Sequence, residues 1–137
     1  MENNEIKYRK FLPGIAWFFI VDVLTLMPGR DVPQVDFLDG IPQFDKLVHA
    51  GLFGGLVFFF CLPLINYPLS HRQKIYHFIR IALAAIVWGI TVEFLQKYYI
   101  PGRDFDLLDW AADSAGVLLA LWLVIRTLTN FENKKVQ

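Results

Sequence analysis

Two pairs of polar side chains stand at the ends of apolar segments, at spacings that place each pair on one face of a helix. Asp45 and His49 are four residues apart, and Glu93 and Gln96 are three residues apart. At ~100° per residue, both spacings bring the two side chains onto the same face. Carboxylates and imidazole can exchange protons, coordinate metal ions or pair with cationic groups. These residues therefore predict a polar site where the ends of helices meet.

A series of carboxylates opens the last apolar segment. Asp106, Asp109 and Asp113 fall within ~60° of one another if the helix has begun by Asp106. An acidic residue at the centre of a membrane helix costs about 2.5–3.5 kcal/mol, so we expect these side chains to face inward. The carboxylates outnumber the nearby basic side chains, Lys46 and Arg103. The excess negative charge requires water, bound protons, a metal ion or a cationic group on a ligand.

Some of these residues also have a simpler interpretation. A single histidine at the end of a membrane segment, such as His49, is more often a hydrated interfacial side chain than a ligand. Gly51 and Gly55 form a G-x-x-x-G pattern on the face opposite His49, which predicts close helix packing rather than binding. Glu93 and Asp113 are embedded in otherwise apolar segments, where functional or structural pairing is the usual explanation. These two carboxylates therefore argue most strongly for a site.

Four apolar segments must position these side chains. They cover about residues 11–27, 47–65, 78–96 and 107–126, close to the roughly 20 residues with which a helix spans the hydrocarbon core. Hydrophobic residues make up 55% of the chain and charged residues 19%, and a soluble domain of this size could hardly bury so much apolar surface. Asp22 lies inside the first segment and no small-x-small site follows it, so we expect a retained helix rather than a cleaved signal peptide. The sequence predicts an all-α fold: a four-helix integral membrane bundle that forms one domain over residues 1–137.

Basic residues are divided unequally between the two sides of this bundle. Nine Lys and Arg lie in or beside the N-terminus, the 67–77 connection and the C-terminus, and four lie on the other side. The positive-inside tendency then predicts a plasma (inner) membrane protein with both termini in the cytoplasm and the polar site facing outward. The net charge of zero and the lack of a basic cluster indicate no nucleic-acid partner. Cys61 is the single cysteine, so no intramolecular disulfide is expected.

The polar residues follow a defined order along the chain. They read Asp45-Lys46-x-x-His49, then Glu93-x-x-Gln96, then Pro101-Gly102-Arg103-x-x-Asp106-x-x-Asp109-x-x-x-Asp113-x-x-Gly116. This order resembles the pattern of VanZ-like membrane proteins of bacteria over about residues 20–120, including the number of spans. Asp113 departs from the pattern, because Asn is common at that position of the family. The resemblance implies a cell-envelope protein in a family whose namesake lowers susceptibility to the glycopeptide antibiotic teicoplanin, and it implies no established mechanism.

The chain carries no Ser-x-x-Lys, Gly-x-Ser-x-Gly, His-Glu-x-x-His or Gly-rich phosphate loop. No known catalytic motif therefore selects a reaction, and three functions stay open. The first is a binding protein for an envelope lipid, a lipid-linked cell-wall precursor or a glycopeptide antibiotic, in which Lys46 and Arg103 hold phosphate or carboxylate groups. Another is a cation- or proton-coupled transporter. Transport is the least favoured of the three, because four spans are few unless the protein oligomerises.

The remaining function is an intramembrane enzyme that acts on a lipid-linked substrate. His49 or Glu93 would then be the general base, and a divalent ion would be held by Asp106, Asp109 and Asp113. The sequence does not choose between binding and catalysis, and it leaves catalytic residues, cofactor, metal and oligomeric state open. The lipid bilayer is the expected partner in each case. The candidate ligand-binding residues are Asp45, Lys46, His49, Glu93, Gln96, Arg103, Asp106, Asp109 and Asp113.

Overall fold

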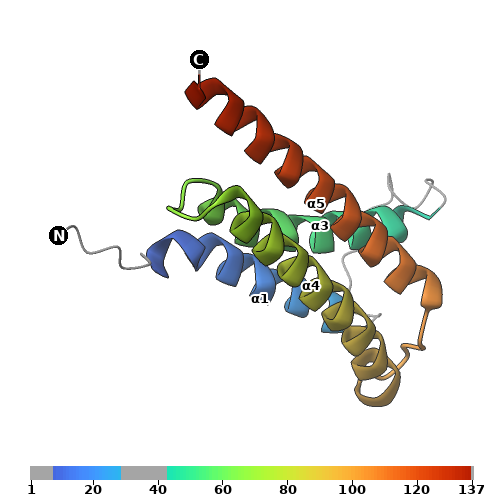
Figure 1. Cartoon of the computed structure of the whole chain (residues 1–137). Helices are drawn as coiled ribbons and strands as arrows, with labels where there is room; N and C mark the ends of the chain where they lie inside the picture. Colours follow the sequence, from blue (N-terminus) through green and yellow to red (C-terminus); the bar gives the residue numbers. More distant parts are fainter. Residues whose placement is uncertain (1–7, 29–42, 137) are drawn as a thin grey trace.

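A computed structural model describes residues 8–28 and 43–136, and all regular structure in these ranges is helical (Figure 1). The prediction of an all-α fold is therefore confirmed for the part of the chain that the structure describes. The elements are the short 3-10 helix η1 (Tyr8–Phe11) and the helices α1 (Leu12–Leu26), α3 (Phe44–Ile65), α4 (His71–Tyr99) and α5 (Leu107–Val136).

Three of the four long helices have the length and composition of a membrane span. These are α3 with 22 residues, α4 with 29 residues and the stretch Leu107–Lys134 of α5 with 28 residues. Helix α1 has 15 residues, which at 1.5 Å per residue extend about 22 Å, less than the roughly 30 Å of a hydrocarbon core. The chain is therefore a membrane protein with three helices of full spanning length and a shorter first helix packed beside them.

The helices are longer than the apolar segments that predict them. Helix α4 begins at His71 rather than near 78 because Ser70 caps it: the Ser70 hydroxyl accepts a hydrogen bond from the Gln73 amide at 3.3 Å, and the Gln73 side chain accepts one from the Ser70 amide at 3.0 Å. Such a reciprocal cap starts a helix without apolar residues. An apolar segment marks the buried part of a helix, whereas capping sets its ends.

Neighbouring helices in the sequence run in opposite directions, which brings the polar ends together. Trp17 donates a hydrogen bond to the carbonyl of Leu52 at 2.9 Å, joining α1 to α3, and Gln96 donates one to the carbonyl of Thr25 at 2.7 Å, joining the ends of α4 and α1. In Figure 1, α1 begins and α5 ends on the side of the α3–α4 connection, and the α4–α5 connection lies at the opposite end. The end of α1, the start of α3, the end of α4 and the start of α5 thus share one end of the bundle.

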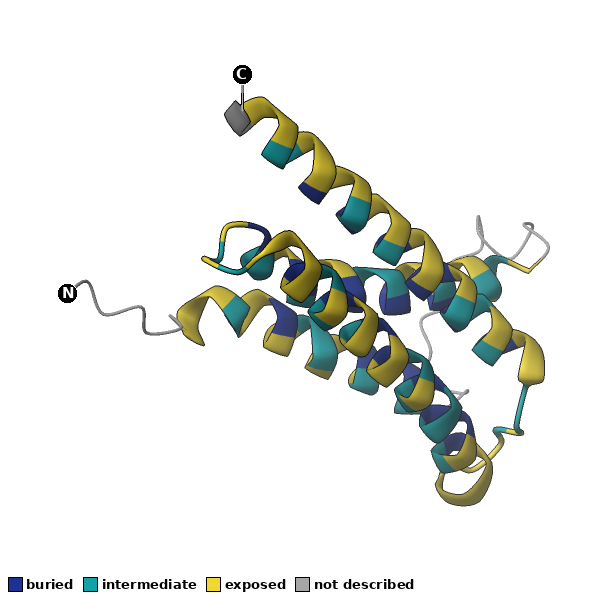
Figure 2. Cartoon of the chain, in the orientation of Figure 1, coloured by how far each residue is buried: buried dark blue, intermediate teal, exposed yellow. Residues whose placement is uncertain are grey.

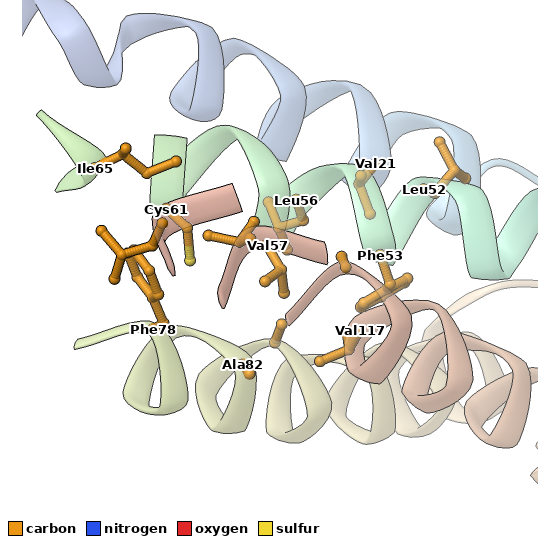
Figure 3. Packing of buried hydrophobic residues seen from close by; sticks show 14 of the residues in the cluster. Val21, Leu52, Phe53, Leu56, Val57, Cys61, Ile65, Phe78, Ala82 and Val117 are labelled. Atoms are coloured by element: carbon orange, nitrogen blue, oxygen red, sulfur yellow. The ribbon is translucent and has the colours of Figure 1, made fainter. Parts of the chain in front are cut away.

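An apolar core lies between the helices (Figure 3), and exposed positions line their outer faces (Figure 2). Many of these exposed residues are large and apolar. Phe53, Val57 and Phe78 are fully buried. By contrast, Phe19 and Leu119 are 62% and 59% exposed. Outward apolar faces of this extent are what lipid-facing helices present, and in a soluble monomer they would form an unusually large apolar surface.

The closest helix contact is a backbone contact between α3 and α5. A Cβ atom added at Gly116 would collide with the Ala50 carbonyl group, and one added at Gly54 would lie 3.0 Å from the Gly116 carbonyl oxygen. Of the G-x-x-x-G pair expected to permit packing, Gly55 does so against Trp17, whereas nothing lies within 4 Å of a Cβ at Gly51. The prediction of close packing is therefore right for Gly55 and wrong for Gly51. On this part of α3, Gly54 makes the close contact with α5.

A separate polar network ties the helices at the other end of the bundle. The buried Lys74 side chain donates a hydrogen bond to the carbonyl of Ile65 at 2.8 Å and lies 3.5 Å from a Glu132 carboxylate oxygen. The second oxygen of Glu132 lies 2.6 Å from His71 Nδ1. Charged side chains thus join α3, α4 and α5 at both ends of an apolar core.

Candidate functional site

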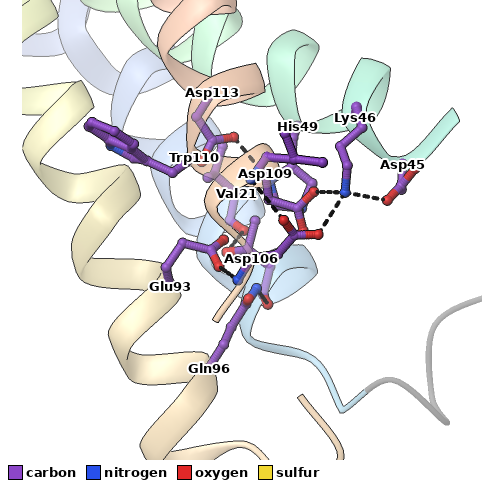
Figure 4. A network of polar contacts seen from close by, with 12 residues as sticks. Val21, Asp45, Lys46, His49, Glu93, Gln96, Asp106, Asp109, Trp110 and Asp113 are labelled. Atoms are coloured by element: carbon purple, nitrogen blue, oxygen red, sulfur yellow. Dashed lines mark hydrogen bonds and ion pairs between the residues drawn. The ribbon is translucent and has the colours of Figure 1, made fainter. Parts of the chain in front are cut away.

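Four buried polar side chains from three helices meet near one end of the bundle (Figure 4). His49 comes from α3, Glu93 from α4, and Asp109 and Asp113 from α5. Glu93 and Asp113 are fully buried, and His49 and Asp109 are 8% and 7% exposed. The side chains reach one another because α3 and α5 run in parallel from this end while α4 approaches it from the opposite direction. We call these four residues the buried cluster.

His49 contacts both carboxylates of α5. Its Nδ1 atom lies 3.0 Å from Asp113 Oδ1, within hydrogen-bond distance, and its Nε2 atom faces Asp109 Oδ2 at 3.7 Å, which is too long for a hydrogen bond. Asp113 therefore fixes the orientation of the imidazole ring, and Nε2 is directed toward Asp109.

Lys46 lies at the rim of the buried cluster and binds three carboxylates at once. Its Nζ atom lies 3.0 Å from Asp45, 2.9 Å from Asp106 and 2.5 Å from Asp109. The Lys46 side chain is 19% exposed, whereas the Asp45 side chain is 62% exposed and belongs to the surface. These contacts occupy the three N–H donors of one ammonium group, so Lys46 has no donor left for a ligand while it binds these carboxylates.

Asp106 connects the start of α5 to both neighbouring helices. One of its carboxylate oxygens accepts a hydrogen bond from the amide of Leu108 at 2.7 Å, the arrangement that caps a helix start, and its own amide donates one to Glu93 at 2.8 Å. The hydrogen bond from Lys46 is the largest of the effects that lower the pKa of Asp106 below its usual value. Asp106 precedes the first residue of α5, so this charged side chain lies outside the apolar part of the helix and ties its start to α3 and α4.

Two buried carboxylate oxygens have no hydrogen-bond partner within the described residues. One is Oε1 of Glu93, whose other oxygen accepts the hydrogen bond from Asp106. The second is Oδ2 of Asp113, which lies 3.2 Å from the position that a Cβ at Gly89 would occupy. Leaving a buried polar atom unpaired costs about 1–3 kcal/mol, and more for a charged group. Donors within residues 8–28 and 43–136 therefore leave two acceptors unsatisfied at this position.

The buried cluster has the spacing of a metal-binding group. One potential ligand atom from each of His49, Glu93 and Asp109 can be chosen so that all three lie within 4.8 Å of one another. The same arrangement could exchange a proton between imidazole and carboxylate, or hold a cationic group of a ligand.

Seven of the nine predicted site residues belong to this connected network, and two lie apart from it. Gln96 is buried, but its amide group binds the backbone of α1 at Thr25. Arg103 lies in the α4–α5 connection, where its backbone amide donates to Ile100 and its Nε atom is buried without a partner in the described structure. Asp22, an acidic residue of α1, accepts a hydrogen bond from Trp88 at 3.0 Å.

Trp110 and Gly89 complete the walls around Asp113. The Trp110 indole donates a hydrogen bond to the carbonyl of Ile86 on α4 at 3.1 Å, and its ring lies 3.4 Å from the Cβ position of Gly89. Trp110 therefore packs from α5 against α4. The signal that could have shown this is its position next to Asp109, between two inward-facing carboxylates.

No protein-family model, no curated protein and no solved structure matches this chain. The resemblance to VanZ-like proteins therefore stays a prediction that rests on the order of the polar residues.

Proposed function

We propose that this protein is an integral membrane protein of the bacterial cell envelope, and that its buried cluster binds the headgroup of an envelope lipid or a lipid-linked precursor. The supporting observation is that unpaired carboxylate oxygens of Glu93 and Asp113 lie buried at one end of a bundle with apolar outer faces. A ligand whose headgroup enters this end can leave its acyl chain in the bilayer, so only the headgroup is desolvated.

The charges of the site indicate which headgroups fit. Lys46 is already paired with three carboxylates, so it is not the phosphate-binding group that the sequence suggests. Arg103, whose Nε atom is buried and unpaired, remains the candidate for an anionic group. The buried cluster itself is acidic, so it would bind an amine or a cation that accompanies a phosphate.

The resemblance to VanZ-like proteins extends this proposal to membrane-anchored glycopeptide antibiotics such as teicoplanin. The test is expression of the wild type, Glu93→Gln and Asp104→Asn in a susceptible Gram-positive host. Asp104 is an exposed carboxylate of the α4–α5 connection, so Asp104→Asn is a matched control. We expect the wild type and Asp104→Asn to lower teicoplanin susceptibility and Glu93→Gln to have no effect. Equal susceptibility of all strains and the empty vector, with each protein present in the membrane, would exclude a glycopeptide role and leave another envelope lipid.

Binding of a lipid-linked precursor can be measured directly on the purified protein. Native mass spectrometry of the protein with a purified lipid-linked cell-wall precursor should show a retained lipid on the wild type and on Asp104→Asn. Retention should be lost in Glu93→Gln. If all three proteins retain the lipid equally, it binds the outer faces of the helices and the proposed site is wrong.

A second candidate function is enzymatic, and the contact between His49 and Asp113 at 3.0 Å favours it. A carboxylate that orients an imidazole is the arrangement by which a histidine serves as a general base. Incubation of the protein with the same lipid-linked precursor, followed by mass spectrometry of the lipid, separates the two functions. A product that forms with the wild type and not with His49→Gln indicates catalysis, and an unchanged lipid indicates binding.

A further inference from the structure

The geometry points to a divalent metal ion bound by His49, Glu93 and Asp109, which we call the ligand trio. This set differs from Asp106, Asp109 and Asp113, which the sequence suggests as metal ligands, because the structure draws one ligand from each of three helices. Metal binding by the ligand trio does not depend on the lipid ligand proposed above.

Each member of the ligand trio has one polar atom fixed by a neighbour and a second atom left free. His49 Nδ1 contacts Asp113, Glu93 Oε2 accepts a hydrogen bond from Asp106, and Asp109 Oδ1 contacts Lys46. The atoms that remain are His49 Nε2, Glu93 Oε1 and Asp109 Oδ2. Glu93 Oε1 is buried without a partner, and Nε2 and Oδ2 face each other at 3.7 Å.

The spacing of the ligand trio suits a single ion. Ligand atoms from the three residues lie within 4.8 Å of one another. Metal ions bind nitrogen and oxygen ligands at about 2.0–2.6 Å, so two ligands of one ion are separated by at most about 4–5 Å. This spacing therefore allows one ion to contact all three residues.

The charge balance of the buried cluster also favours a bound cation. Glu93, Asp109 and Asp113 are buried carboxylates, and Lys46 is the basic side chain in contact with one of them. Because Lys46 is shared with Asp45 and Asp106, it does not by itself neutralise the buried carboxylates of the described residues when they are ionised and His49 is neutral, as a metal ligand must be. A divalent ion supplies the missing charge.

Asp113 is the positioning residue of this site. A histidine that binds a metal through one ring nitrogen usually donates its other N–H to a carboxylate, which fixes the ring and makes it a better ligand. Asp113 contacts His49 Nδ1 at 3.0 Å in this manner. The mixture of one imidazole and two carboxylates favours Zn²⁺ or Mn²⁺ over Mg²⁺ and Ca²⁺, which prefer oxygen ligands alone.

The test measures binding of Mn²⁺ and Zn²⁺ to the full chain, purified in detergent and stripped with EDTA. We expect the wild type and the control Asp104→Asn to bind one ion per chain. Glu93→Gln and Asp109→Asn should lose this binding, and Asp113→Asn should keep the stoichiometry but bind about 10–100-fold more weakly. If the wild type binds neither ion, or if Glu93→Gln binds as tightly as Asp104→Asn, the proposal is wrong.

A spectroscopic measurement on the wild type provides a second test that does not depend on whether the variants fold. Pulsed electron paramagnetic resonance of bound Mn²⁺ detects coupling to a ligating imidazole nitrogen without any substitution. We expect this coupling in the wild type. Bound Mn²⁺ without nitrogen coupling in the wild type would show an ion held elsewhere, for example by Asp45 and Asp106, and would overturn the assignment to His49.

Discussion

Single residues show how far helical spacing predicts a site. The spacing of Asp109 and Asp113 correctly indicates a shared inward face, as the cost of a charge in the membrane predicts. Asp45 is different, because its side chain is exposed while His49, four residues later, is buried. The spacing does not say which side chains touch. Gln96 shares a face with Glu93 yet binds the backbone of α1, because the packing of α1, which no local pattern encodes, decides its partner.

Glu93→Gln should leave the metal-free protein equally stable or more stable. The substitution removes a fully buried charge that has one unpaired oxygen, and it keeps an acceptor for the amide of Asp106. Relief of such a group amounts to about 1–3 kcal/mol. Thermal unfolding in EDTA, followed by circular dichroism, measures the effect. A clearly lower unfolding temperature would show that Glu93 is satisfied by contacts within the protein.

Asp106 should titrate at a lower pH than an ordinary aspartate, and this shift should depend on Lys46. The hydrogen bond from Lys46 lowers the pKa of Asp106 in the folded protein. Its contribution to stability is therefore fully present above the unfolded pKa of about 4 and is lost as the pH falls through the lower folded value. Carboxyl-carbon NMR titration of the wild type and Lys46→Gln provides the measurement. An unchanged Asp106 pKa in Lys46→Gln would contradict this origin of the shift.

At the scale of the elements, small residues decide how closely the helices that carry the site can approach each other. The backbone contact between Gly116 and Ala50 sets the distance between α3 and α5, and His49 and Asp113 lie on these two helices. The sequence shows small residues at Gly51, Gly54 and Gly55, but all three are equally small. Which one faces α5 depends on the rotation of α3, which the complete packing determines.

Gly116→Ala should destabilise the bundle, and Gly51→Ala should not. A methyl group at Gly116 meets the Ala50 carbonyl, whereas nothing lies within 4 Å of one at Gly51. Overpacking of this kind costs about 1–3 kcal/mol, and an exposed helical Gly→Ala change gains up to about 1 kcal/mol. Unfolding with increasing sodium dodecyl sulfate, followed by tryptophan fluorescence, compares the two variants. Equal stability would mean that α3 and α5 can separate freely.

At the scale of the whole molecule, the apolar segments predict the number of long helices but not that the first helix is shorter than a full membrane span. Helix α1 is a real element, yet its 15 residues are fewer than a full span requires. Hydropathy alone cannot reveal this, because it counts apolar residues whether or not they are helical. The single polar end still forms, since α1 runs beside α4 in the same direction.

Labelling should place the two ends of the bundle on opposite sides of the membrane. In a Cys61→Ala background, Asp104→Cys should react with a membrane-impermeant maleimide on intact cells. Arg9→Cys and Asn66→Cys should react only after permeabilisation, as the distribution of basic residues predicts. Labelling of Arg9→Cys together with Asp104→Cys would show that α1 does not cross. Labelling of Arg9→Cys and Asn66→Cys without Asp104→Cys would show the inverted topology.

The contact between α3 and α5 has a consequence for biosynthesis. These helices flank α4 in the chain, so α5 leaves the ribosome after both α3 and α4. Lys46 and His49 therefore enter the membrane before any of their carboxylate partners on α5 has been made. Until α5 is made, Asp45 is the one of its three carboxylate partners that Lys46 can contact, which leaves the charge of α3 less well paired than in the folded protein. In pulse-chase experiments, chains stopped before residue 107 should be degraded faster than full-length chains, and Lys46→Met should slow that degradation. Equal lifetimes would show that α3 is stable in the membrane without α5.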